Sequence, residues 1–320
     1  MRALRRRILT PNVSATSMAT RGFHVKNQES RELLERVGRT FLQGYAYAAE
    51  ARVPADAERG LETVPTRFRG FAYEGAAMAF SVIDTSPLPG KGRFERFLQG
   101  RGDAHIYMAY VGVGWAMARL PRFTWRRVVA PDFLLRWLVL DGYGFHQAYF
   151  QTDRYVHGQH HENDFPWPAG DFGAYRARAI DQGIGRAMWF VAGTDVDVLI
   201  SMFEKFPQAR RADLFSGAGL AATYAGGATE EELRSFWKQA GPYRPQVAQG
   251  SAFAAEARSK AGLIVPHVEL ATDIFCGMTP TEAAMVNAES LPELIDQPDL
   301  PAYEVWRQRI ADRFASLGRN

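Results

Sequence analysis

The chain has 320 residues, of which 47% are hydrophobic and 12% aromatic, values typical of a globular protein with a large core. Its 38 basic and 35 acidic residues give a net charge of only +3, so composition does not point to nucleic acid as a partner. The sequence has no uninterrupted run of about 18 apolar residues, so no transmembrane helix is predicted. The single Cys276 excludes an internal disulfide and suits a reducing compartment.

The first 28 residues form a basic leader, with no acidic residue before Glu29. Its basic run consists of Arg2, Arg5, Arg6 and Arg7. Such a start is typical of an organelle transit peptide, of a basic arm for a membrane surface, or of a segment that packs on the domain that follows. It lacks the apolar centre of a secretory signal. We favour the packed leader, for a reason that the family resemblance below supplies.

A short glycine pattern recurs seven times along the rest of the chain. Each copy has a glycine, a Gly or Ala two residues on, and usually an alanine four residues on. The glycines are Gly44, Gly75, Gly112, Gly142, Gly183, Gly217 and Gly250. Their spacing of about 30 to 40 residues is typical of α-helical repeat proteins. No copy follows a β-branched strand, so a dinucleotide-binding loop is excluded.

Helical periodicity places each glycine inside a long helix. The predicted glycine helices span residues 29–51, 66–82, 103–120, 131–149, 174–192, 209–225 and 245–261. Short helices are predicted at 92–99, at 194–206, after the capping box of Thr229 and Glu232, and at 266–275, 279–288 and 302–317. The pattern therefore predicts one all-α domain of about seven helix pairs, an α-solenoid or a closed toroid, over residues 29–294. Residues 1–28 form the leader, and residues 295–320 contain a capping helix.

Positions around the glycine repeat as well. Small residues at the glycine and four residues on share a helix face, which lets another helix approach closely. The residue three positions after the glycine, here called the +3 residue, is large in every copy. The residue just before the glycine, the −1 residue, is polar in six copies: Gln43, Glu74, Asp141, Gln182, Ser216 and Gln249. These polar residues either form a hydrogen-bonded ladder between repeats or converge on a site.

His146 breaks the small-residue rule, because it stands where the other six copies have alanine. Asp141 precedes it by five residues, and aromatic residues surround both. Two interpretations stay open. His146 is either an acid, base or orienting donor in an aromatic pocket, or a core histidine bonded to a neighbouring carbonyl.

The carboxylates Glu74, Asp141 and Asp181 stand just before the glycines of equivalent helices. They either line one cavity together or pair with arginines one repeat along. The predicted catalytic set is Asp141, His146, Asp181, Glu74 and Arg186. The predicted substrate-binding residues are Tyr73, Trp115, Tyr143, Phe145, Tyr149, Gln182, Trp189 and Tyr224. We expect no cofactor, because no redox or nucleotide motif occurs, and no G-x-S-x-G motif supports a hydrolase.

A histidine-rich loop lies between the fourth and fifth repeats. It contains His157, His160, His161, Glu162 and Asp164, residue types that suit zinc. Adjacent histidines in a flexible loop lack the spacing of a preorganised site, so we predict a solvated loop and no metal site.

Long stretches of the chain, between residues 21 and 294, resemble the bacterial family DUF1702. They include RGFHVK (21–26), RGFAYEGAAMA (69–79), YVGVGWAMARLPR (110–122), LDGYGFHQAYF (140–150), DQGIGRAMWFVAG (181–193) and RRADLFSGAGLAATYAGG (210–227). The leader also resembles the usual start of this family, which favours the packed leader over a transit peptide.

The resemblance implies a role in natural-product biosynthesis. Members look like products of the enediyne gene cassette, beside an iterative polyketide synthase, a thioesterase, an ASPIC/UnbV-type protein and an RnfD/NQR2-like membrane protein. We therefore expect a biosynthetic protein of enediyne-type polyketide maturation, which binds or converts a hydrophobic linear polyene in an aromatic-lined cavity.

Two alternatives stay open, and with them whether the protein is an enzyme. One is a cofactor-free acid/base cyclase or isomerase of a polyene or isoprenoid. The other is a non-catalytic scaffold for the membrane protein and the ASPIC/UnbV-type protein, located in the cytoplasm with peripheral contact to the inner face of the membrane. A cavity that holds Asp141 and His146 favours an enzyme, whereas an exposed apolar patch favours a scaffold.

Overall fold

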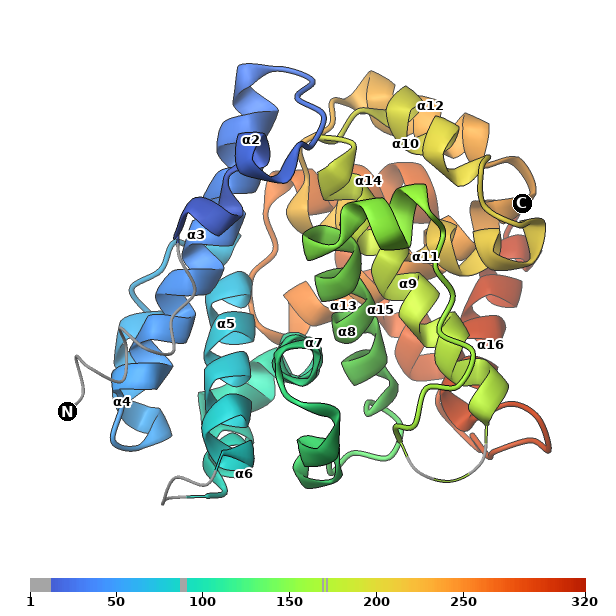
Figure 1. The fold of residues 1–320 in the computed structure, drawn as a ribbon. Coiled ribbons are helices and arrows are strands. Elements are labelled where there is room, and N and C mark those ends of the chain that lie inside the picture. Colours follow the sequence, from blue (N-terminus) through green and yellow to red (C-terminus); the bar gives the residue numbers. More distant parts are fainter. Residues whose placement is uncertain (1–12, 87–90, 169, 171) are drawn as a thin grey trace.

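A computed structural model describes residues 13–86, 91–168, 170 and 172–320 of the chain. This part of the chain is helical throughout and contains no β-strand (Figure 1). The predicted all-α single domain is confirmed. None of the helices in the described ranges combines the length and the apolar character needed to cross a membrane.

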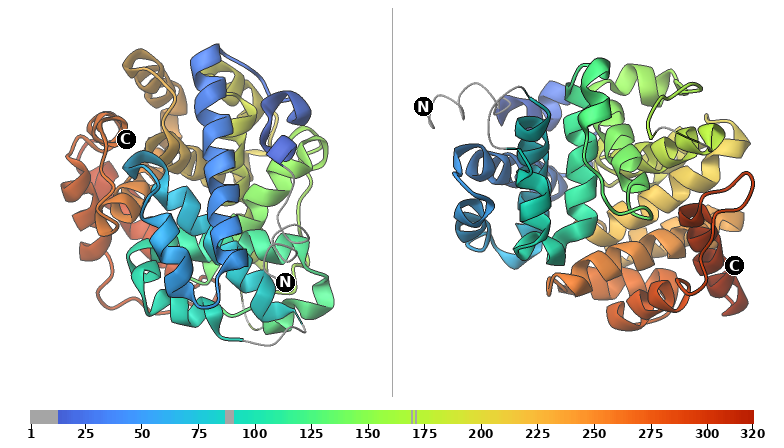
Figure 2. Two further views of the ribbon diagram at one scale, coloured as in Figure 1. Left: turned by 90° about the vertical axis from the view of Figure 1, so that its left-hand side faces the viewer. Right: turned by 90° about the horizontal axis from the view of Figure 1, so that it is seen from below.

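The seven predicted glycine helices are present and form one continuous row. They are α3 (Gln28–Glu50), α5 (Thr66–Thr85), α7 (Ile106–Arg119), α8 (Trp137–Phe150), α9 (Gly173–Val191), α11 (Gln208–Ala225) and α13 (Arg244–Lys260). Each packs mainly against the next in this order, and the row curls so that α13 also touches α7 (Figures 1 and 2). The curl brings equivalent faces of the helices together in the interior.

Successive glycine helices run antiparallel and touch backbone to backbone. Gly142 of α8 packs on the carbonyl oxygen of Val111, while Gly114 of α7 packs on that of Val139. The later residue of α7 faces the earlier residue of α8 and the earlier faces the later, so the two helices run in opposite directions. A methyl group on either glycine would overlap the facing carbonyl. The predicted close approach at the glycines is therefore confirmed.

The two glycines of one copy contact different neighbours. In α9, Gly183 packs on the carbonyl of Asp141 from α8, whereas Gly185 packs on the carbonyl of Leu214 from α11. Two residues correspond to a rotation of about 200° on a helix, so the G-x-G pair faces both sides of the row. The pattern thus allows one helix to pack closely against two neighbouring helices.

Short elements join the glycine helices. The α-helical ones are α4 (Pro54–Leu61), α6 (Arg93–Leu98), α10 (Val196–Phe203) and α12 (Glu230–Ala240), while α14 (Pro266–Cys276) and α15 (Pro280–Glu289) follow the last glycine helix. The predicted caps are confirmed: Asp195 accepts from the backbone N–H groups at the start of α10, and Thr229 forms a capping box with Glu232. Helix α4 was not anticipated from the sequence.

Among the residues that the structure describes, no α-helix joins α7 to α8 or α8 to α9. A 3-10 helix (Arg122–Arg127) fills the first connection, and a π-helical turn (Asp153–His157) begins the second. The predicted start of the fourth helix at Pro131 is wrong, because α8 begins at Trp137. Asp132 explains the delay: its Oδ1 accepts hydrogen bonds of 2.8 Å from the backbone N–H groups of Leu134 and Leu135, which fixes a turn instead.

The leader and the C-terminus both pack on the row. In the described part of the leader, a 3-10 turn (Val13–Thr16) and α2 (Met18–Arg21) contact α3, and Phe23 lies with its ring centroid 4.9 Å from that of Tyr149. The leader thus reaches α8 as well as the first repeat. Its basic residues Arg2, Arg5, Arg6 and Arg7 lie outside the described residues.

The C-terminal helix α16 (Ala302–Ser316) is held by a buried ionic network. Arg307 donates 2.8 Å hydrogen bonds to Asp213 of α11 and to Glu304 of its own helix. Arg178 of α9 binds the same two carboxylates. Ion pairs therefore fix α16 against α9 and α11.

Candidate functional site

A pocket lies inside the curled row of helices, and we call it the central pocket. The space between its walls is about 800 Å³, including its opening to solvent. Its walls come mainly from α3, α5, α7, α8, α9 and α11, and exposed Arg119 marks the end nearest to solvent. The residues on which the argument depends are Phe41, Phe71, Glu74, Met78, Trp115, Phe145, His146, Tyr149, Arg186, Phe190, Leu220 and Tyr224.

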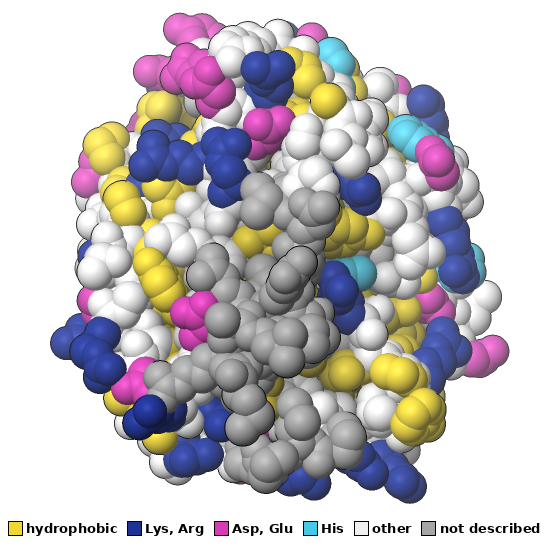
Figure 3. Space-filling view, turned by 60° about the vertical axis from the view of Figure 1, so that its left-hand side comes forward, with side chains coloured by type: hydrophobic (Ala, Val, Ile, Leu, Met, Phe, Trp, Pro, Cys, Tyr) yellow, Lys and Arg dark blue, Asp and Glu magenta, His cyan; other side chains and the backbone are white. Residues whose placement is uncertain are grey.

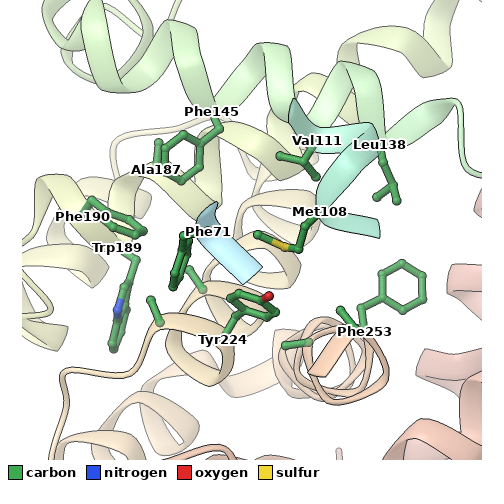
Figure 4. Close-up of a cluster of buried hydrophobic side chains, with 14 of the residues drawn as sticks. Phe71, Met108, Val111, Leu138, Phe145, Ala187, Trp189, Phe190, Tyr224 and Phe253 are labelled. Atoms are coloured by element: carbon green, nitrogen blue, oxygen red, sulfur yellow. The ribbon is translucent and has the colours of Figure 1, made fainter. Parts of the chain in front are cut away.

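A smaller second pocket adjoins the central one, and the space between its walls is about 470 Å³, including open solvent. Arg186, Leu220 and Tyr224 line both pockets and therefore form the partition between them. Asp141 and Phe253 belong to the second pocket only. Figure 4 shows the side chains of Phe145, Tyr224 and Phe253 from three different helices directed into this interior.

The repeat itself builds the central pocket. Five +3 residues from successive helices line it: Met78, Trp115, Phe145, Arg186 and Leu220. Phe253, the +3 residue of the seventh copy, lines the second pocket. Because antiparallel neighbours meet at equivalent positions, the curl of the row brings these large side chains together. Arg186 is the only charged +3 residue, so the repeat places one cation in an apolar interior.

Aromatic rings supply a large part of the wall. Trp115 lies between Phe41 and Phe145, with ring centroids 4.6 Å and 5.3 Å away. Phe71 of α5 meets Tyr224 of α11 edge to face at 5.2 Å, and Figure 4 shows the two side chains near each other. Such walls favour a flat or elongated apolar molecule over a polar one.

Three interacting ionisable side chains, Arg186, Asp141 and Glu74, lie in the walls of the two pockets. Arg186 forms a buried ion pair with Asp141 Oδ1, while Asp141 Oδ2 has no hydrogen-bond partner among the described residues. Burial raises the pKa of Asp141, and the guanidinium opposes that shift. Burial also disfavours the arginine cation, but the charges of Asp141 and Glu74 outweigh it and raise the pKa of Arg186. Each partner of the ion pair thus favours the charged form of the other.

Glu74 is the third group. Burial raises its pKa from 4.5 to about 8, and the charge of Arg186 opposes that shift. The indole N–H of Trp115 also lowers the pKa, although its geometry falls short of a hydrogen bond. Glu74 is therefore mostly a neutral carboxylic acid near pH 7, and it can donate a proton or a hydrogen bond into the central pocket.

This protonation predicts a pH-dependent stability. Unfolded Glu74 ionises above about pH 4.5, whereas folded Glu74 keeps its proton up to about pH 8, so its stabilisation is complete below pH 4.5 and is lost as pH rises to 8. Relative to Glu74→Gln, we expect the unfolding free energy of the wild type to fall by up to about 1.4 kcal/mol per pH unit in that window. Urea unfolding at several pH values measures it. A constant difference would mean that folded Glu74 is ionised.

His146 lines the central pocket as a neutral base. Burial lowers its pKa to about 4. The Gln147 amide nitrogen donates to the hydroxyls of Tyr143 and Tyr155, so its Oε1 faces His146 and accepts from Nδ1–H at 3.2 Å. This tautomer leaves Nε2 as the acceptor. His146 thus combines both interpretations from the sequence: it is bonded to a neighbouring carbonyl oxygen and it also lines the pocket.

The structure brings eight of the thirteen predicted site residues to these pockets. Asp141 lines the second pocket. The central pocket contains Glu74, Trp115, Phe145, His146, Tyr149, Arg186 and Tyr224.

Five predicted site residues line neither pocket. Asp181 accepts hydrogen bonds of 2.9 and 2.6 Å from Nε and Nη2 of Arg210, which lies in the next glycine helix. Pairing with an arginine was one of the two alternatives that the sequence left open for this carboxylate. The other four have local partners in the packing. Tyr73 stacks on His105, the Tyr143 hydroxyl lies 3.4 Å from Glu162, Trp189 donates to the Gly226 carbonyl, and Gln182 accepts from Tyr303.

The sequence did not predict several wall residues of the central pocket: Phe41, Phe71, Met78, Phe190 and Leu220. Met78 and Leu220 are +3 residues, so the repeat carried the signal for both. Phe41 stands three residues before its glycine, a position that is apolar in every copy. No repeat position distinguishes Phe190.

The histidine-rich loop is bound by local contacts. Glu162 accepts from Tyr155 at 2.5 Å, Arg154 lies 2.8 Å from His160, and Arg210 donates to the carbonyl of Gln159 at 2.7 Å. Within the ranges that the structure describes, no three His, Cys, Asp or Glu side chains form a group that could hold a metal ion.

On the face in Figure 3, basic and acidic side chains are interspersed.

Together these features define an all-α repeat protein with two adjoining, mostly apolar pockets, a buried ion pair where they meet and one neutral acid in the central pocket. The chain matches the family described as "Protein of unknown function (DUF1702)" over residues 1–314. It therefore belongs to this family, as its motifs indicated. No curated protein and no solved structure matches the chain significantly.

Proposed function

We propose that the protein binds a hydrophobic linear polyene in the central pocket, as a biosynthetic protein of enediyne-type polyketide maturation. The observation that carries the proposal is the pocket wall, which is aromatic or aliphatic except for Glu74, His146, Arg186 and a few residues near the opening. An apolar pocket with few polar groups binds an apolar ligand and fixes its register. The enediyne context comes from the family resemblance.

The neutral carboxyl of Glu74 favours conversion of the ligand over storage. A carboxylic acid that keeps its proton near pH 7 suits a general acid. His146 Nε2 supplies an unprotonated acceptor in the same pocket. This pair supports a cofactor-free isomerase or cyclase of a polyene or isoprenoid.

One surface feature favours the scaffold as a second candidate. Phe123 and Phe133 are 77% and 51% exposed, in the connection between α7 and α8, beside exposed Arg126 and Arg127. Exposed aromatic and basic side chains suit a membrane surface or a protein partner such as the RnfD/NQR2-like or the ASPIC/UnbV-type protein. We rank the scaffold second, because it gives no role to the ionisable groups of the pocket.

Filling the pocket tests ligand binding. Met78→Trp enlarges a +3 residue of the wall, and Trp115 shows that a tryptophan is accommodated at this repeat position. We expect Met78→Trp to weaken binding of a linear tetraene hydrocarbon by at least about tenfold, as measured by fluorescence titration. Tyr47→Trp is the matched control, since Tyr47 is the +3 residue of α3 and lines neither pocket. Equal affinities of the two variants and the wild type would place the ligand elsewhere.

A further inference from the structure

The partition between the two pockets holds hydrogen-bond donors that the protein does not use. Arg186 is 6% exposed and gives one nitrogen, Nη1, to Asp141. Its Nε and Nη2 donate to no atom of the described residues, yet they are not sealed from the pocket space. Buried guanidinium groups are normally saturated with acceptors, so these free donors indicate a missing acceptor.

Glu74 is a second unused donor, in the wall of the central pocket. It is 3% exposed, and the group that approaches its oxygens as a donor is the indole N–H of Trp115, which lowers its pKa. Its carboxyl and the Arg186 guanidinium are close enough for each to shift the pKa of the other. Both groups line the central pocket, so one ligand atom can meet a cation and a carboxylic acid there.

The charge balance determines which acceptor fits. Asp141 already neutralises Arg186, and Glu74 adds no charge while it is protonated. A ligand carboxylate would therefore add an uncompensated negative charge to a buried site, at a large desolvation cost. A neutral oxygen that accepts two hydrogen bonds satisfies both donors without that cost.

We infer that the ligand is a conjugated polyene carbonyl compound, whose oxygen lies at the partition and accepts hydrogen bonds from Arg186 and Glu74. The inference rests on the proposed function and specifies its ligand class. The polyene chain lies along the aromatic wall of the central pocket, and the substituent beyond the carbonyl enters the second pocket beside Phe253. Both donors pull electron density toward the oxygen, so bound ligand is activated along the conjugated chain.

Three probes of equal carbon number test the inference: a linear tetraenyl methyl ketone, the corresponding tetraene hydrocarbon and the corresponding tetraenoic acid. We expect the ketone to bind at least about tenfold more tightly than the hydrocarbon. We also expect its absorption maximum to move to longer wavelength on binding, because donors at the oxygen stabilise the charge-separated excited state. Tighter binding of the acid than of the ketone would overturn the neutral-carbonyl assignment.

Variants of Glu74 separate recognition from folding. Glu74→Gln keeps an N–H donor and should retain the preference for the ketone, whereas Glu74→Leu should reduce it and diminish the spectral shift. Unchanged selectivity in Glu74→Leu would overturn the role of Glu74. Equal affinity of the wild type for ketone and hydrocarbon overturns this inference alone. Binding of none of the probes overturns both the inference and the proposed function.

Discussion

Replacing Gly183 by alanine should destabilise the protein by about 3 kcal/mol or more, the upper end of the range for overpacked sites. Its methyl group would meet the carbonyl of Asp141 and the backbone nitrogen of Phe145, both in α8. Neither atom belongs to a flexible side chain, so α8 and α9 would have to separate. Gly185 clamps α9 to the carbonyl of Leu214 in α11, which prevents α9 from moving freely.

Gly173→Ala is the matched control in the same helix. A methyl group there would meet only Arg176 Nη1 at 3.9 Å, an ordinary contact. We expect a change within about 1 kcal/mol of the wild type, since alanine otherwise favours a helix. Thermal and urea unfolding of the two variants measure the difference. Equal stability of Gly183→Ala and Gly173→Ala would refute the backbone contact between α8 and α9.

The sequence contained enough information for the architecture of the row. Seven equivalent glycines predicted the helices, and capping residues such as Thr229 predicted where connectors begin. The sequence predicted no short helix between α7 and α8 and a loop between α8 and α9, but it did not show that α8 begins only at Trp137, because this depends on the turn that Asp132 fixes. The antiparallel order follows from long-range packing, which no local pattern encodes.

Helix geometry explains which site predictions correspond to the pockets. The −1 and +3 residues are four apart and share a face, and Glu74 and Met78 accordingly line one pocket. Asp181 stands two residues before its glycine, which is about 140° away from the +3 direction. It therefore faces Arg210 instead. Tyr143, one residue after its glycine, is about 200° away by the same geometry and packs outside the pocket.

Trp189 shows where this geometry no longer decides. It lies three residues after Arg186, on nearly the same face, yet it packs on Phe236 of α12 with ring centroids 6.1 Å apart. It lies about one turn closer to the C-terminal end of α9, beside the short connecting helix α12. Its ring contact with Phe236 and its hydrogen bond to the Gly226 carbonyl hold Trp189 outside the pocket, and both contacts depend on tertiary packing.

Arg186→Met should destabilise the protein by about 3–5 kcal/mol, because it leaves Asp141 buried without its partner cation. Asp141 Oδ2 already lacks a hydrogen-bond partner among the described residues, so the carboxylate has no alternative donor of its own. The nearest other influence is the charge of Arg307, whose guanidinium is bound to Asp213 and Glu304. Urea unfolding at neutral pH measures the loss.

The double variant Arg186→Met/Asp141→Asn should recover most of that stability, since it removes both buried charges together. A pair that can be replaced at little cost in stability is not required for the fold, which leaves ligand recognition as the reason for its presence at the partition. The double variant should then unfold like the wild type but lose its preference for a polyene ketone over the hydrocarbon. If the double variant is as unstable as Arg186→Met, the ion pair holds α8 and α9 together and its role is structural.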